Sequence, residues 1–124
     1  MSEKKAFKRG GSFLVEEMKP DEVFTPEDFR EEHRMMIVTT EDFVKRDVVP
    51  HREALEHKNF PATRKLMRKA GELGLLGAEV PEEYGGGGIT STLTHCIVME
   101  ELNWGCAGIA TGLLGAGLAY LPII

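Results

Sequence analysis

Two adjacent carboxylates, Glu100 and Glu101, are the residues of this chain whose types are best suited to acid–base chemistry. Paired carboxyl groups can act as a general acid and a general base when both reach the same substrate. Adjacent residues of a helix, however, point about 100° apart, so these two cannot converge on one atom. We expect one to hydrogen-bond a neighbouring helix or backbone and the other to face solvent.

Four successive glycines, Gly85 to Gly88, form a second motif that could do chemistry, because glycine-rich loops before helices can cradle phosphates. The Lys-Ser/Thr pair of a phosphate-binding loop is missing, and no strand is predicted before the glycines. Pro81 also interrupts regular structure in this segment. The pattern therefore predicts a structural turn over Gly77–Ile89, and no cofactor-binding residue is assigned to it.

A basic quartet offers the third candidate, a phosphate-binding patch; it consists of Arg64, Lys65, Arg68 and Lys69. Long cationic side chains are also the ordinary cover of an exposed helix face, which is the interpretation we favour. The formal net charge of −5 argues against a nucleic-acid footprint, which needs a concentrated basic face.

The two cysteines, Cys96 and Cys106, lie in the apolar half of the chain. Two cysteines make neither a disulfide framework nor a zinc site, so no metal site is predicted and a reducing, cytoplasmic setting is expected. The N-terminal segment carries Lys4, Lys5 and Lys8 but no apolar stretch behind them, unlike a secretory signal.

Helical patterns dominate the rest of the chain. Thr25 as N-cap, Pro26 at the first position and a Phe24–Phe29 staple predict a helix that ends before Pro50. Its apolar face would consist of Phe29, Met36, Ile37, Thr40, Phe43 and Val44.

Two further helices are predicted. The first begins at Asn59 or Phe60 and ends at Gly74, with Leu66, Met67, Ala70 and Leu73 facing inward. The second runs from about Ser91 to Trp104 and should be buried on more than one side, through Leu93, Cys96, Ile97, Met99 and Leu102.

The last 23 residues, Leu102–Ile124, contain no charged side chain and include five glycines. Because each glycine costs a helix interior about 1 kcal/mol relative to alanine, we expect another element to lie close against the segment 107–118. A transmembrane helix is an alternative, supported by the small-residue spacing of Gly108 and Gly112. Asn103, Thr111 and the absence of a flanking basic cluster argue against it.

Three stretches together resemble the N-terminal helical domain of acyl-CoA dehydrogenases, and the resemblance covers the chain from about Gly10 to Ile124. The stretches are Leu73-Gly-Leu-Leu-Gly-Ala-Glu-Val-Pro-Glu-Glu-Tyr-Gly-Gly86, Met99-Glu-Glu-Leu102 and Gly105-Cys-Ala-Gly108. The segments 10–14 and 24–29 are similar to the longer N-termini of bacterial and very-long-chain members. The resemblance implies an FAD enzyme that removes a proton and a hydride from the carbons next to an acyl-CoA thioester. It also implies electron transfer to an electron-transfer flavoprotein and a homo-oligomer at full length.

In such an enzyme a middle β-domain and a C-terminal helical bundle supply much of the flavin site and the catalytic carboxylate. The resemblance therefore assigns no catalytic and no cofactor-binding residue to this chain, and the chain alone is expected to be inactive. What it does assign is the deep end of the acyl cavity, at Ala110, Thr111, Leu114 and Leu118. The alternative is that these four residues only pack against a neighbouring helix.

We therefore predict an all-α fold of about four helices in an up-and-down arrangement, with a glycine-rich loop between the second and third. Residues 1–22 are predicted to be a mobile tail, and residues 23–124 an acyl-CoA dehydrogenase-like helical domain that is incomplete at its C-terminal end. The competing function is a non-catalytic helical interaction module; a membrane-associated helix hairpin is a third alternative.

Overall fold

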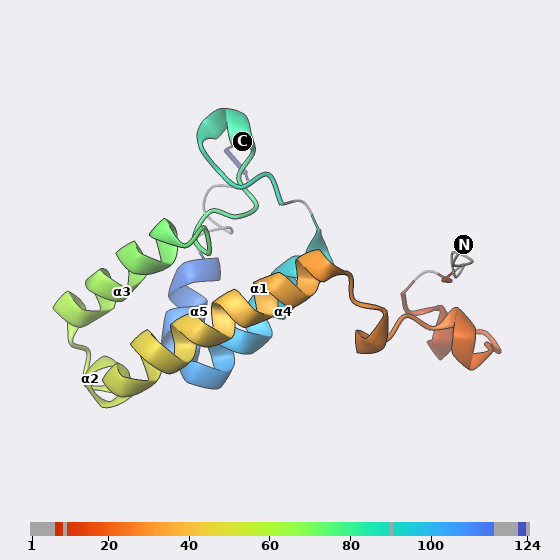
Figure 1. Ribbon diagram of the computed structural model, residues 1–124, viewed down its shortest axis with the longest axis horizontal. Helices are drawn as coiled ribbons and strands as arrows, with labels where there is room; N and C mark the ends of the chain where they lie inside the picture. Colours follow the sequence, from red (N-terminus) through yellow and green to blue (C-terminus); the bar gives the residue numbers. More distant parts are fainter. Residues whose placement is uncertain (1–6, 9, 90, 116–121, 124) are drawn as a thin grey trace. The chain divides into compact units, whose positions relative to one another are not determined.

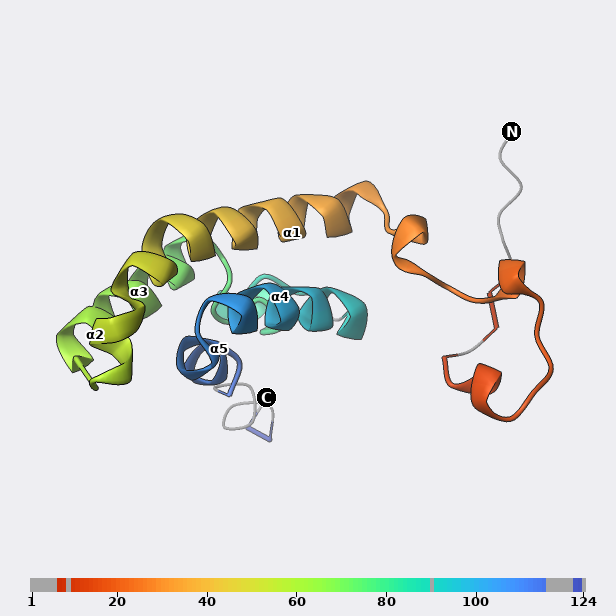
Figure 2. The same cartoon turned by 90° about the horizontal axis from the view of Figure 1, so that it is seen from below.

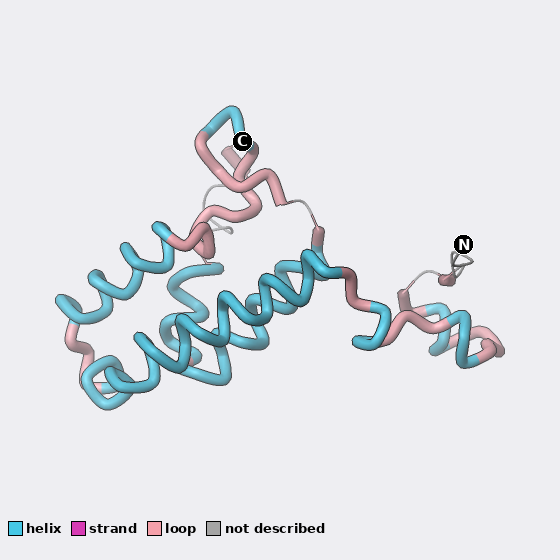
Figure 3. Tube along the Cα trace, viewed as in Figure 1, coloured by secondary structure: helices cyan, strands magenta, loops and turns pink. Residues whose placement is uncertain are grey.

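A computed structural model describes residues 7, 8, 10–89, 91–115, 122 and 123, apart from the side chain of Leu114. These residues form helices, turns and loops with no strand (Figure 3), which confirms the predicted all-α class. The chain divides into two compact units, Met1–Glu31 and Glu32–Ile124.

The first unit contains three short 3₁₀ turns, Ser12–Leu14, Pro20–Glu22 and Pro26–Asp28. The ring of Phe24 lies between those of Phe7 and Phe29, with centroid distances of 5.2 and 6.0 Å. Residues 1–6 and 9 of the predicted mobile tail lie outside the described residues.

The predicted helix start at Thr25 is wrong. The Asp28 carboxylate accepts hydrogen bonds from the amide and the hydroxyl of Thr25, at 3.1 and 3.2 Å, so the capping residues close a single turn. Phe29 then takes an extended conformation with ψ of 132°, which ends the turn. The first α-helix, α1 (Glu31–Phe43), begins two residues later.

Pro50 does not stop the helical path that follows α1. A proline lacks the amide hydrogen that an α-helical turn needs. The chain passes Pro50 through a wider π-helical turn, Val44–Val48, and then a 3₁₀ turn, Val49–His51. The short helix α2 (Arg52–Glu56) follows directly. Residues 44, 48 and 52 are thereby placed on one continuous helical path.

Helix α3 (Phe60–Glu72) begins where predicted, and Gly74 takes the left-handed φ of 73° expected of its C-terminal stop. The Asn59 side chain caps the first turn by accepting a hydrogen bond from the amide of Ala62. Leu66 and Ala70 are buried as predicted. Leu73 is 37% exposed, contrary to the prediction, because it follows the last residue of the helix.

The segment between α3 and α4 is the predicted turn, and it folds back on itself. Backbone amides of Gly87, Gly88 and Ile89 donate to the carbonyls of Gly77, Val80 and Ala78, respectively. A Cβ atom on Gly86 would overlap the Val80 carbonyl, so only glycine allows this approach.

Helix α4 (Thr92–Gly105) lies beside α1 and runs in the same direction, while α3 runs back the other way (Figures 1 and 2). Helix α5 (Ala107–Leu114) follows after one residue. Ile97 and Leu102 are buried as predicted, whereas Cys96 is exposed, contrary to the prediction. The core is formed by Phe43, Val44, Val48, Leu66, Ala70, Leu75, Val98, Leu102, Ile109, Ala110 and Leu113.

Candidate functional site

The corner between α4 and α5 is where the predicted site residues begin. Cys106, the single residue between the two helices, is extended, with φ of −163° and ψ of 113°. Its carbonyl accepts the amide of Ala110 at 3.1 Å, which starts the new helix. Ile109 and Leu113 then enter the core, so α5 is anchored on one side and open on the other.

The four predicted acyl-cavity residues have different surroundings. Ala110 is completely buried among core side chains, whereas Thr111 is exposed. The side chain of Leu114 and all of Leu118 lie outside the described residues. Ala110 and Thr111 therefore do not share one face of α5, and their joint role in lining a cavity stays a prediction.

Arg52, the first residue of α2, connects this helix to the end of α4, which lies 52 and 53 residues later in the chain. Its Nε donates to the carbonyl of Gly105 at 2.8 Å, and its Nη2 donates to the carbonyl of Trp104 at 3.2 Å. The last carbonyls of a helix have no partner within it, and a cation at that end also matches the helix dipole. Arg52 thus caps α4 at the point where the chain turns into α5.

Two open hollows flank this corner. One, of about 250 Å³, lies between the α2–α3 connection and α5 and is lined by Leu55, Phe60, Cys106 and Ile109, among others. The other, of about 450 Å³, is bordered by Arg52, Glu56, Trp104 and the first residues of α5. The first is mainly apolar, and the second combines a cation, a carboxylate and an exposed indole.

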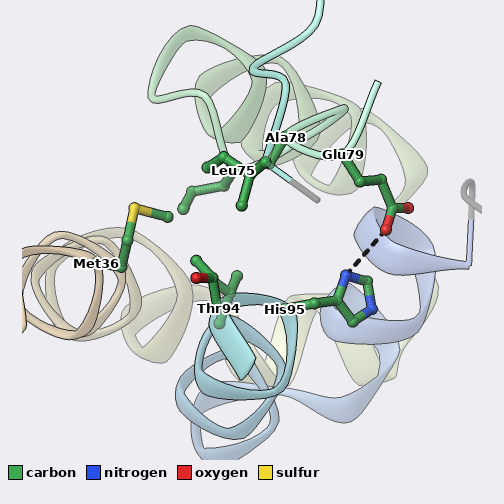
Figure 4. Close-up of a pocket in the computed structure, with 8 residues that line it drawn as sticks. Met36, Leu75, Ala78, Glu79, Thr94 and His95 are labelled. Carbon is green, nitrogen blue, oxygen red and sulfur yellow. Dashed lines mark ion pairs between the residues drawn. The ribbon is translucent and has the colours of Figure 1, made fainter. Parts of the chain in front are cut away.

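A third hollow, which is only about 20 Å³ in volume, lies between α1, α4 and the glycine-rich turn (Figure 4). Met36, Leu75, Ala78 and Thr94 line it, and Nδ1 of His95 is 3.1 Å from Oε2 of Glu79 at its edge. Its volume is about that of one water molecule, so it is a packing gap rather than a ligand site.

The carboxylates Glu100 and Glu101 do not form an acid–base pair. Glu100 is exposed and Glu101 is half-buried, in line with the 100° between adjacent helical positions. Burial raises the pKa of Glu101, and repulsion from Glu41 and Glu100 adds to this, partly offset by Lys45. Glu41 lies on α1, Lys45 on the π-helical turn that follows it, and Glu100 on α4, so Glu101 is part of the contact between α4 and this helical path.

Comparison with known proteins decides the family. The family model described as "Acyl-CoA dehydrogenase, N-terminal domain" matches residues 30–124. The chain belongs to this family. The matched range covers α1 to α5, including the corner at Cys106.

Members of the acyl-CoA dehydrogenase family are similar to the chain over most of its length. It is 43% identical to a probable acyl-CoA dehydrogenase of Bacillus subtilis over 94% of the chain and 19% of that protein. It is 39% identical to the human mitochondrial short-chain specific acyl-CoA dehydrogenase over 68% of the chain and 19% of that protein. A crystal structure of an acyl-CoA dehydrogenase from Bacillus anthracis, complexed with FAD, matches 84% of the chain and 18% of its own length. Its TM-score is 0.73 and its sequence identity 47%. The chain thus spans about a fifth of the length of its relatives.

Within the described residues, no three His, Cys, Asp or Glu side chains are grouped so that they could hold a metal ion. Within the same residues no helix combines the length and the apolar character needed to cross a bilayer.

Two polar contacts were not foreseen from the sequence. Arg52 and Gly105 are far apart in the chain, and no local spacing rule relates them. Lys69 was predicted to face water, but it is half-buried and pairs with Asp47, which links α3 to the π-helical turn Val44–Val48. Partial burial alone would raise the pKa of Asp47, but hydrogen bonds from Lys69 and Arg46 hold this pKa below its ordinary value.

Proposed function

We propose that this chain is the N-terminal helical part of a longer acyl-CoA dehydrogenase. The observation that carries the proposal is the likeness of 84% of the chain to a solved family member that is complexed with FAD. The longer enzyme would remove a proton and a hydride from the two carbons next to an acyl-CoA thioester. FAD would accept the hydride, and an electron-transfer flavoprotein would then reoxidise the flavin; the enzyme would assemble as a homo-oligomer.

We assign neither the flavin site nor the catalytic base to this chain. The hollow of about 450 Å³ is open, and its cation, Arg52, is already hydrogen-bonded to the end of α4, so these residues do not make up a flavin site by themselves. The charged neighbours of Glu101 are Glu100 on its own helix, Glu41 on α1 and Lys45 on the π-helical turn after α1, so we give Glu101 a role in helix packing.

The role that we assign to this chain is to form the deep end of the acyl cavity through α5. Ala110, Thr111, Leu114 and Leu118 would close this end with apolar or small side chains. Each methylene that a dry cavity buries contributes about 0.8 kcal/mol, so the depth at these positions would set the preferred acyl chain length. A long or medium unbranched acyl group is the proposed substrate.

Thr111 gives a cleaner test of this role than Ala110, because Ala110 is buried in the core of the chain itself. In a longer protein that contains this chain, Thr111→Phe should shift kcat/KM toward shorter acyl chains. Thr111→Ser, which keeps the hydroxyl and removes one methyl, is the matched control and should leave the preference nearly unchanged. An unaltered chain-length profile in the Phe variant would contradict the cavity role.

The enzyme class is tested separately by flavin absorbance. A longer protein that purifies yellow and reduces its flavin on addition of acyl-CoA supports the proposal. The alternative, a non-catalytic helical module, predicts a colourless protein that acyl-CoA does not change.

A further inference from the structure

We infer that Arg52 is a positioning residue that fixes the direction of α5 and through it the depth of the acyl cavity. This inference rests on the proposed function for its link to the acyl chain, but the effect on α5 is independent of it. Arg52 would influence specificity without touching the substrate.

The first step of the argument is the unusual end of α4. Cys106 donates its amide to Leu102, and α5 then leaves in a new direction. Arg52 donates to the carbonyls of Trp104 and Gly105, the last two residues of α4. Because the guanidinium is planar and charged, its two bonds fix the carbonyls in direction as well as in distance.

The second step is the contact on the apolar side of the same corner. A Cβ atom on Gly105 would lie 2.5 Å from Cγ1 of Val44 and 3.3 Å from Cγ1 of Val48. Val44, Val48 and Arg52 are spaced four residues apart on one helical path, so two apolar groups and one cation hold the same end of α4. The last residue before the corner is therefore restrained from two sides.

The third step is that α5 itself is packed on one side only and by apolar contacts. Its exposed side carries the small residues Ala107, Gly108, Thr111 and Gly112. Its buried side, Ile109, Ala110 and Leu113, packs in the core by apolar contacts, and the hydrophobic effect behind them is not directional. The hydrogen bonds of Arg52 supply the directional restraint at the start of the helix.

The test on this chain compares Arg52→Met, which keeps the apolar stem, with Arg64→Met on the exposed face of α3 as the matched control. Amide hydrogen exchange of residues 110–113 should be about tenfold faster in Arg52→Met, as expected for the loss of charge-assisted hydrogen bonds. Exchange within α3 should not change. The near-UV circular dichroism of Trp104, the single tryptophan, should also weaken.

If Arg52→Met unfolds the whole chain, Arg52→Lys replaces it in the exchange experiment. A lysine keeps the charge but cannot make the two directed bonds, so it should accelerate exchange in α5 by a smaller factor. Equal exchange of α5 in the Arg52 and Arg64 variants would overturn the inference.

The link to specificity is tested in the longer protein by measuring kcat/KM over a series of acyl chain lengths. Arg52→Met should broaden or shift the preference, whereas Arg64→Met should not. If Thr111→Phe shifts the profile and Arg52→Met does not, the positioning role is wrong and the cavity proposal stands. A third outcome is that amide exchange in α5 rises in Arg52→Met, but neither Thr111→Phe nor Arg52→Met changes the chain-length profile. The cavity proposal then fails, and with it the role of Arg52 in specificity.

Discussion

The glycine-rich turn and helix α5 are both rich in glycine, but their glycines meet different surroundings. In the turn, Gly77, Gly85 and Gly88 have positive φ angles, and a Cβ atom on Gly87 would lie 2.9 Å from the carbonyl oxygen of Ala78. In α5, a Cβ atom on Gly112 would lie 3.6 Å from the side chain of Met67, an ordinary contact distance.

This difference shows which glycines the chain itself requires. The turn needs glycine because its backbone approaches itself or takes conformations that other residues avoid. Within the described residues nothing comparable constrains Gly108 or Gly112, which are exposed. The glycines of α5 therefore support the proposal that another part of a longer protein, or its ligand, lies against this helix.

The largest effect is expected from Gly86→Ala in the turn. The new methyl group would overlap the backbone of Val80, which cannot move without breaking the paired segments of the turn. We expect a loss of about 3 kcal/mol in the free energy of unfolding, measured with urea. Gly85→Asn is the control, because asparagine tolerates a left-handed φ and no atom lies within 4 Å of the added Cβ. A Gly86 variant as stable as this control would contradict the argument.

A smaller loss, of about 2 kcal/mol, is expected from Gly105→Ala at the corner, because the added methyl group would press on Val44. Here the obstacle is a side chain, so removing it should relieve the strain. In a double-mutant cycle, Gly105→Ala should cost less than about 0.5 kcal/mol when it is made in the Val44→Ala background. Simple additivity of the two variants would show that Val44 is not the obstacle.

The turn and the helices show how far sequence reasoning reaches. The turn over 77–89, the start of α3 at Phe60, its stop at Gly74, and the buried Leu66 and Ala70 were all predicted, because each depends on residues that are close in sequence. The start of α1 was predicted wrongly, because the same capping residues can close one turn as well as open a helix.

The parts that could not be predicted depend on contacts between distant elements. The bonds of Arg52 to α4 and of Lys69 to Asp47 both require the helices to be packed first. The site residues are an intermediate case: Ala110 and Thr111 were assigned by resemblance, but their opposite burial follows only from how α5 enters the core.

Two half-buried carboxylates, Asp47 and Glu101, differ in the same way as the two groups of glycines: the surroundings within the chain suit one of them and not the other. Asp47 finds Lys69 and Arg46 within the chain, whereas Glu101 has a raised pKa, first from burial and then from its acidic neighbours. Because the pKa of Asp47 is lowered on folding, Asp47 stabilises the fold above its ordinary pKa of about 3.9. That contribution is lost as the pH falls through the lowered value.

Asp47→Asn should therefore cost about 1 kcal/mol at pH 7. The difference from the parent chain should shrink as the pH falls below about 4, because the parent carboxylate is then protonated as well. Urea unfolding at a series of pH values measures this. Asp42→Asn, an exposed position on α1, is the control and should give a difference close to zero. A pH-independent cost at Asp47 would mean that its charge is not involved.

The smallest effect is expected from Gly112→Ala, and it tests the comparison most directly. In this chain alone the substitution adds helix propensity without a clash, so it should stabilise the fold by about 0.5–1 kcal/mol, opposite in sign to Gly86→Ala. In a longer protein that places another element or an acyl chain against α5, the same methyl group would meet a neighbour. The gain should then disappear, or the acyl-chain preference should change. A gain of equal size in both proteins, with unchanged specificity, would show that nothing approaches this face of α5, and the distinction between the two glycine clusters would then be one of geometry alone.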